Sequence, residues 1–206
     1  MMRLAAFCIA MLLAACAKPK FNPDWTKETA PETFTAVFET TKGDFEVTVT
    51  RSHSPAAADR FYQLVKYGYF DNALFYRVVE DFVVQFGNTD TIQMNQWRSQ
   101  KIPDEPVLLS NKKGTISFAR DGVESRDLEL FINLDDNPKL DTLFYNGVRG
   151  FPAFGKVTEG MDVVRSLYQG YGEETMAHYE KMYNDRQGFY RDYPKLDIIR
   201  KAAIVK

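Results

Sequence analysis

The sequence predicts a mainly β domain, a barrel or a sandwich whose ends are covered by helices. Short segments in which apolar and polar residues alternate recur along most of the chain. Only two main stretches have the spacing of an amphipathic helix, and no internal repeat is visible. The 206 residues include sixteen Phe and eleven Tyr, which suits one domain with a sizeable core.

The N-terminus has the layout of a secretory signal. Arg3 precedes an apolar stretch that is too short and too early for a spanning helix. The stretch ends in Leu-Ala-Ala-Cys16, which resembles the lipobox of bacterial lipoproteins. We therefore expect a signal peptide at 1–15 and a lipid-bearing, palmitoylated Cys16 that anchors the protein to a membrane of the cell envelope, facing the periplasm or exterior. The alternative is ordinary signal cleavage after Ala17, which also fits the small-residue rule.

Residues 16–33 are predicted to be a flexible tether between this anchor and the domain. The segment contains three prolines and many polar residues. Trp25 could instead dock on the domain. The folded domain would then occupy residues 34–206.

The domain begins with a predicted β-hairpin and a helix. Residues 34–50 alternate apolar and polar positions on both sides of a turn at Gly43. Ser54 is a suitable helix N-cap, Pro55 suits the first helical position, and Gly68 suits the helix end.

The remaining elements are short. A second helix is predicted at 160–171, and a further helix that ends at Gly188 is predicted inside an insertion at 171–195. Residues 88–113 are polar and irregular. Strands are expected twice within 70–87 and then at 114–119, 130–134, 153–157 and 198–205.

Composition excludes several classes of chemistry. A net charge of −2 offers no basic surface for nucleic acid. With two histidines and no cysteine cluster, the sequence argues against a zinc site or a histidine-based triad. No phosphate-binding glycine motif is visible. We therefore expect no metal and no cofactor.

Four sequence blocks follow one another over most of residues 34–169. They are FYRVVEDFVVQFGN, IPDE followed by GTISFAR, LFINLDDNPKLD, and GFPAFGKVTEGMDVV. In this order they resemble the cyclophilin-type peptidyl-prolyl cis-trans isomerases. The resemblance implies a closed eight-stranded antiparallel β-barrel capped by two α-helices, with a peptide groove on its outside. It also implies a monomer that acts on proline-containing unfolded or exported polypeptides.

Two polar residues interrupt the apolar run of the first block. Arg77 and Gln85 are eight positions apart, and an even spacing places both on one face of an extended chain. Buried polar groups are costly unless they have a role. The resemblance gives Arg77 the position of the catalytic arginine, and Gln85 that of the glutamine that binds substrate backbone and steadies the arginine.

The resemblance also implies the residues of the substrate groove. Phe82, Phe131 and Leu140 would form the pocket for the proline ring, although from the sequence alone the two phenylalanines could simply be core. The predicted substrate-binding residues are Phe82, Val83, Ala119, Arg120, Glu129, Phe131, Leu140 and Phe151.

Several positions depart from the family pattern. Glu129 stands where a glutamine is usual, Lys139 replaces an aromatic residue, and Phe151 replaces a polar one. The Glu129 carboxylate could pair with Arg77, compete with substrate for its donors and reduce turnover, and we predict that Glu129→Gln raises activity. It could also orient Arg77 without harm.

These residues predict a lipid-anchored prolyl isomerase that assists protein folding outside the cytoplasm. One alternative is a cyclophilin-like module that binds proline-containing chains with little or no catalysis, as Glu129, Lys139 and Phe151 suggest. Another is an envelope assembly factor that acts through a partner-binding face on the 171–195 insertion.

Overall fold

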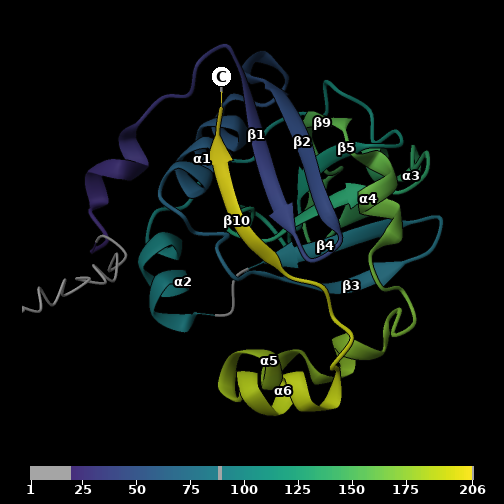
Figure 1. Cartoon of the computed structure of the whole chain (residues 1–206). Coiled ribbons are helices and arrows are strands. Elements are labelled where there is room, and N and C mark those ends of the chain that lie inside the picture. Colours follow the sequence, from purple (N-terminus) through teal and green to yellow (C-terminus); the bar gives the residue numbers. More distant parts are fainter. Residues whose placement is uncertain (1–19, 88–89, 206) are drawn as a thin grey trace, which may run out of the picture.

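The structure is a computed structural model that describes residues 20–87 and 90–205. The predicted signal peptide and Cys16 lie outside these ranges, so both remain predictions. The described residues form a curled sheet with helices around it (Figure 1).

One eight-stranded antiparallel sheet forms the centre of the molecule. Its strand order is β10-β1-β2-β9-β5-β6-β4-β3. Each segment that was predicted to be a strand contributes one of its members. The strands are β1 (Thr33–Thr40), β2 (Gly43–Thr50), β3 (Leu74–Val79), β4 (Val83–Gly87), β5 (Thr115–Phe118), β6 (Leu130–Asn133), β9 (Ala153–Glu159) and β10 (Ile199–Ile204).

The expected closure of the barrel is not found: the sheet is a curled half-barrel. Its edge strands β3 and β10 meet only at an isolated bridge between Leu74 and Ile198 and a few flanking hydrogen bonds. From Ile199 onward β10 pairs with β1. Figure 1 shows β10 running up beside β1 while β3 crosses the lower part of the sheet, so the two edges diverge.

The core fills the inside of this curl. Alternate residues of β1 and β2 point inward, and the rings of Phe38 and Phe45 stack with centroids 4.9 Å apart. Helix α1 (Pro55–Lys66) closes the core by inserting Phe61 and Leu64, both fully buried. Burial of these aromatic side chains is the main stabilising contribution to the fold.

Helix α1 begins as predicted at Pro55, but its N-terminal cap comes from a distant residue. Ser54 makes no capping bond; its hydroxyl instead donates to Glu105. The Glu105 carboxylate accepts from the amide of Ala56 (2.8 Å) and from that of Ala57 (3.3 Å). A carboxylate suits this position because the amides at a helix N-terminus lack partners within the helix.

The other helices are short. The second predicted helix is α4 (Met161–Ser166), and the predicted irregular segment contains α2 (Thr91–Arg98). The insertion forms one 3-10 helix and two α-helices. Gly188 lies inside the last of them rather than at a helix end, because Asp185 caps this helix by accepting from the Gly188 amide. The remaining elements are α3 (Lys139–Thr142), the hairpin β7 (Phe144–Tyr145) and β8 (Val148–Arg149), η1 (Pro23–Lys27), η2 (Arg51–His53), η3 (Glu174–His178), α5 (Tyr179–Asn184) and α6 (Arg186–Asp192).

The described part of the predicted tether packs against the domain. Trp25 stacks on Tyr67 with ring centroids 4.0 Å apart and planes 6° apart. The Gln63 side chain donates to the carbonyls of Thr26 (3.2 Å) and Glu28 (2.6 Å). The alternative in which Trp25 docks is therefore what the structure shows for residues 20–32, which we call the strap.

We expect the strap to loosen at acidic pH. The Lys66 ammonium and then the Tyr67 hydroxyl bind the Glu28 carboxylate, and together they lower the pKa of Glu28 below its ordinary value of 4.5. A carboxyl group with a lowered pKa in the folded state stabilises that state above pH 4.5, and this contribution is lost as the pH falls through the lowered value. Fluorescence of Trp25 should therefore change in this acidic window. Glu28→Gln should abolish the transition, and an identical titration in that variant would contradict the assignment.

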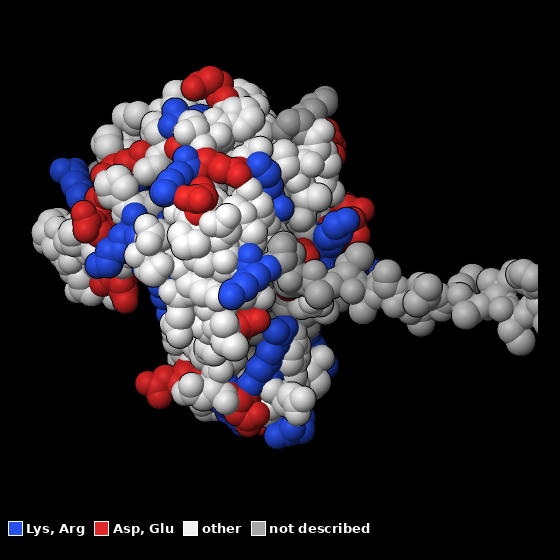
Figure 2. Space-filling model, turned by 90° about the vertical axis from the view of Figure 1, so that its left-hand side faces the viewer, with Lys and Arg blue, Asp and Glu red and all other residues white. Residues whose placement is uncertain are grey.

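Charges of both signs are mixed over the face in Figure 2, which views the molecule from the side of α1 and α2. This face presents no continuous basic surface of the kind that binds nucleic acid. Among the helices of residues 20–87 and 90–205, none is long and apolar enough to cross a membrane.

Candidate active site

Four of the ten predicted catalytic and substrate-binding residues lie on the outer face of β3, β4 and β6. Along β4, Val84 and Phe86 point into the core, whereas Val83 and Gln85 point outward. Along β6, Leu130 and Ile132 face the core, and Phe131 faces outward beside Gln85. This alternation follows from the two-residue period of a strand, so outward residues of neighbouring strands meet.

A β-bulge at Tyr76 sets the direction of the arginine. Phe75 pairs with Phe86, and Arg77 pairs with Gln85, so two steps on β3 match one step on β4. Without the extra residue, Phe75 and Arg77 would point to the same side. The bulge allows Phe75 to enter the core while Arg77 lies on the outer face.

An apolar cavity of about 350 Å³ opens on this outer face. Val83, Phe131 and Leu140 form a small buried cluster at its base, separate from the main core. This volume lies in the usual range for small-ligand pockets. Of the predicted catalytic and binding residues, all but Glu129 line it: Arg77, Phe82, Val83, Gln85, Ala119, Arg120, Phe131, Leu140 and Phe151.

Arg77 is held at the rim of this cavity by two different side chains. Its Nη1 donates to Gln85 Oε1 at 2.9 Å. Its Nε and Nη2 donate to the two carboxylate oxygens of Glu173, at 2.9 and 2.6 Å. The guanidinium also lies 5.6 Å from the centre of the Phe82 ring. The arrangement fixes a cation beside an apolar pocket.

Arg120 is the second cation of the cavity. Its guanidinium lies 5.1 Å from the Phe151 ring, and Nη1 donates to Asp104 at 3.2 Å. Its Nε and Nη2 are buried with no hydrogen-bond partner among the described residues. Burial lowers the pKa of this guanidinium.

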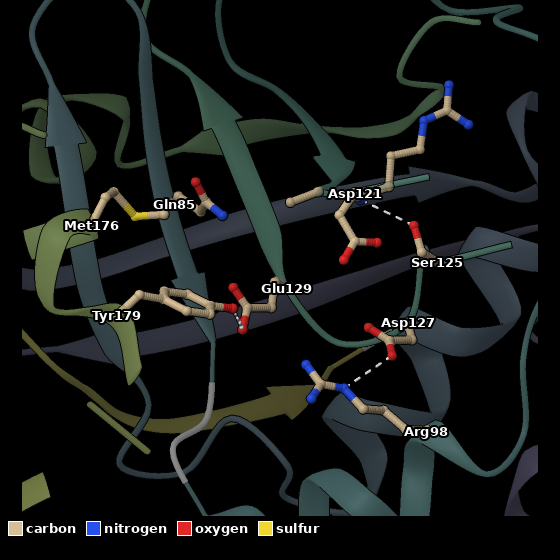
Figure 3. Close-up of a pocket in the computed structure, with 10 residues that line it drawn as sticks. Gln85, Arg98, Asp121, Ser125, Asp127, Glu129, Met176 and Tyr179 are labelled. Carbon is tan, nitrogen blue, oxygen red and sulfur yellow. Dashed lines mark hydrogen bonds and ion pairs between the residues drawn. The ribbon is translucent and has the colours of Figure 1, made fainter. Parts of the chain in front are cut away.

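A second, polar cavity of about 480 Å³ adjoins the first and shares Gln85, Ala119, Arg120 and Met176 with it. Figure 3 shows its charged walls, where Arg98 donates to Asp127 at 3.1 Å and the Asp121 amide donates to Ser125. Burial raises the pKa of Asp127, while Arg98 opposes this effect.

Glu129 lies in the polar cavity and does not pair with Arg77, so the expected contact between these two residues is not formed. Its carboxylate accepts hydrogen bonds from the hydroxyls of Tyr76, Tyr179 and Tyr183 (Figure 3 shows Tyr179). Burial raises the pKa of each of these tyrosines, and the nearby Glu129 charge raises it further, which keeps the hydroxyls protonated as donors.

Of the other two unusual residues, Phe151 lines the apolar cavity and Lys139 lies over one of its walls. The Lys139 ammonium lies 4.8 Å from the centre of the Phe82 ring, so a cation covers part of this wall. The Phe151 ring meets that of Phe131 edge-on, with centroids 5.8 Å apart.

The sequence did not identify Glu173 or Met176 as site residues, although Glu173 binds Arg77 and Met176 lines both cavities. Met176, Tyr179 and Tyr183 recur at roughly helical spacing in the sequence, which is a signal for a packed face. It did not indicate that the tyrosine hydroxyls bind Glu129. Within the described part of the chain, no group of three or more His, Cys, Asp or Glu side chains could hold a metal ion.

Comparison with known proteins assigns the family. A family model described as cyclophilin type peptidyl-prolyl cis-trans isomerase/CLD matches residues 35–185. Peptidyl-prolyl cis-trans isomerase cypE of Dictyostelium discoideum is 32% identical over 141 residues, which are 65% of this chain and 83% of that protein. Peptidyl-prolyl cis-trans isomerase A of Dickeya dadantii is 29% identical over 203 residues, which cover 96% of this chain and 97% of that protein.

Solved structures agree on the fold. A cyclophilin type isomerase of Cryptosporidium parvum superposes with a TM-score of 0.60 at 20% identity, over 84% of this chain and 98% of that chain. Its structure in the presence of the dipeptide Ala-Pro gives a TM-score of 0.59. The family model covers more than half of the chain, and the relatives named above are peptidyl-prolyl cis-trans isomerases. The chain therefore belongs to the cyclophilin-type peptidyl-prolyl cis-trans isomerases and is an enzyme of that class.

Proposed function

We propose that this isomerase accelerates X-Pro rotation in polypeptides outside the cytoplasm, and that Arg77 stabilises the twisted amide. The supporting observation is the placement of the Arg77 guanidinium, bonded to Gln85, at the rim of the apolar cavity. The cation suits the polar amide of an X-Pro segment, and the adjoining apolar pocket suits the hydrocarbon ring of its proline.

The chemistry requires no bond to be made or broken. Resonance gives the C–N bond partial double-bond character, so isomerisation takes tens to hundreds of seconds unaided. In the twisted state resonance is lost and the proline nitrogen regains a lone pair. A donor aimed at that nitrogen favours the twisted state over both planar states, which is the condition for catalysis.

The cavity provides the binding half of the mechanism. Val83, Phe131 and Leu140 offer apolar walls to the proline ring. Gln85 keeps its side-chain amide nitrogen for the substrate backbone while its oxygen accepts from Arg77. The Arg120 guanidinium, 5.1 Å from the Phe151 ring, lines the same cavity. With the proline ring held in the cavity, the residue before proline can rotate about the C–N bond while the ring stays in place.

Exchange NMR on a short proline peptide tests this function directly. Added enzyme should broaden the separate cis and trans signals, because exchange between them becomes fast. A refolding reaction limited by prolyl isomerisation should speed up in parallel. Exchange that remains at the uncatalysed rate with saturating peptide would contradict the proposed isomerisation.

We also propose that Cys16 anchors the enzyme to a membrane of the cell envelope. The lipobox-like sequence before Cys16 supports this location. Full-length protein should fractionate with membranes and carry lipid on its N-terminal cysteine by mass spectrometry. Cys16→Ser should be released in soluble form. An N-terminus at Lys18 would instead indicate ordinary signal cleavage.

A peptide-binding module with weak catalysis is the second candidate. One observation favours it: Glu173 already binds Arg77 through both carboxylate oxygens. If the carboxylate competes with the substrate, a proline peptide would bind while its exchange remained slow. The same NMR experiment separates the two candidates, because binding shifts the signals and catalysis broadens them.

A further inference from the structure

The insertion at 171–195 places a carboxylate on the proposed catalytic arginine, and the family resemblance does not account for it. We propose that Glu173 is a positioning residue, which holds the Arg77 guanidinium in the orientation that meets the peptide. This inference rests on the proposed function of Arg77. The insertion is then part of the active site rather than a separate surface for a partner.

The hydrogen-bond geometry leaves the arginine usable. A guanidinium has five N–H donors. Glu173 takes one on Nε and one on Nη2, and Gln85 takes one on Nη1. One donor on Nη1 and one on Nη2 are therefore left for a substrate. Three bonds from two sides fix both the plane and the rotation of the group, as bidentate Arg–carboxylate pairs do.

The backbone that presents Glu173 is anchored close to Arg77. The Thr175 hydroxyl donates to the backbone carbonyl of Tyr76, the residue next to Arg77. One residue before Glu173, Gly172 forms an isolated bridge with Val78, which directly follows Arg77. The segment is thus attached to β3 on both sides of the arginine.

A second anchor lies further along the insertion. Tyr179 and Tyr183 donate to Glu129, and their two hydroxyl oxygens lie 2.8 Å apart. Met176 lies between the two anchors and lines both cavities. Glu129, which replaces a residue of the family pattern, therefore acts as the attachment point for the element that carries Glu173.

The exposure of the pair indicates positioning rather than stabilisation of the fold. The Arg77 side chain is 20% exposed and that of Glu173 is 60% exposed. Pairs this accessible contribute little to stability because water screens them. Their effect is to limit the many rotamers of a long arginine side chain, which matters for a group that must meet a transition state.

Kinetics of single variants test the proposal. Glu173→Ala should lower kcat by about two- to five-fold, the range expected for orienting through one exposed ion pair, with KM nearly unchanged. Glu173→Gln keeps one acceptor oxygen and should recover part of the loss. Glu174→Ala is the matched control, because Glu174 is the next residue and is also exposed. This substitution should leave kcat unaltered.

A spectroscopic readout tests the contact independently of activity. The Nε–H signal of Arg77 should exchange slowly with water in the wild type, because Glu173 occupies it. The signal should exchange faster in Glu173→Ala. It should also do so in the double variant Tyr179→Phe, Tyr183→Phe, which loosens the anchor without touching the ion pair.

The outcomes separate this inference from the proposed function. A rise in kcat for Glu173→Ala would overturn positioning and identify the carboxylate as a competitor. An unchanged kcat together with an unchanged Nε–H signal would also overturn it. If the wild type shows no catalysis, the proposed function fails, and slow exchange of the Arg77 signal would then support only the contact.

Discussion

Replacing Arg77 by alanine is expected to remove about a hundred-fold or more of the isomerase rate enhancement, the usual effect of deleting one transition-state donor. The guanidinium stands at the rim of the apolar cavity with two N–H groups left for the peptide. Loss of these donors should affect the twisted state most. Because the cavity walls remain, the variant should still bind proline peptides, with kcat reduced far more than affinity.

Exchange NMR at saturating peptide measures this effect, and Arg77→Lys provides the control. Lysine keeps the positive charge, but it cannot make the forked contacts to Gln85 and Glu173 at the same time. It should therefore recover only a small part of the rate. Full activity in Arg77→Ala would exclude the assigned role and leave the cavity as a binding site only.

Replacing Glu129 by alanine should destabilise the protein by about 3 kcal/mol, since buried hydroxyls lose a charged acceptor. Glu129 is 7% exposed, and its carboxylate accepts hydrogen bonds from three tyrosine hydroxyls. In a domain of this size the loss corresponds to a fall of about 6–12 °C in Tm. Activity should fall as well, because the insertion would no longer hold Glu173 against Arg77.

Thermal unfolding and turnover, measured on the same samples, check this prediction. Glu180→Ala is the control, because this glutamate lies in the same insertion but is exposed. Its Tm should stay within about 1 °C of the wild type, as for most surface substitutions. The contrary result, higher turnover in the Glu129 variant, would mean that the acidic residue inhibits the enzyme, as the sequence had left open.

Local patterns predicted much of the fold. Alternation identified the strands because a strand exposes side chains with a period of two, whatever its partners are. Closure of the barrel was not predictable in this way, because it depends on where β3 and β10 run relative to each other. Helix α2 was missed because only Met94 and Trp97 are buried along it, which gives too weak an apolar stripe.

Arg77 and Gln85 lie on one face as predicted, although for a different structural reason. Their even spacing suggested one face of one extended segment. In the structure a tight turn at Asp81 separates two strands, and Arg77 and Gln85 become neighbours across the hairpin. The bulge at Tyr76 then sends Arg77 outward, a local change that alternation alone cannot reveal.

The sequence by itself determined the strands, the family blocks and most of the residues that line the apolar cavity, since these are encoded within short stretches. Only the tertiary structure decided which carboxylate meets the arginine. Glu173 and Arg77 are 96 positions apart, and Tyr183 and Glu129 are 54 apart. Contacts between such distant residues leave no periodic signal in the chain. They exist only because the insertion folds back onto β3 and places its own charges beside a site built from other strands.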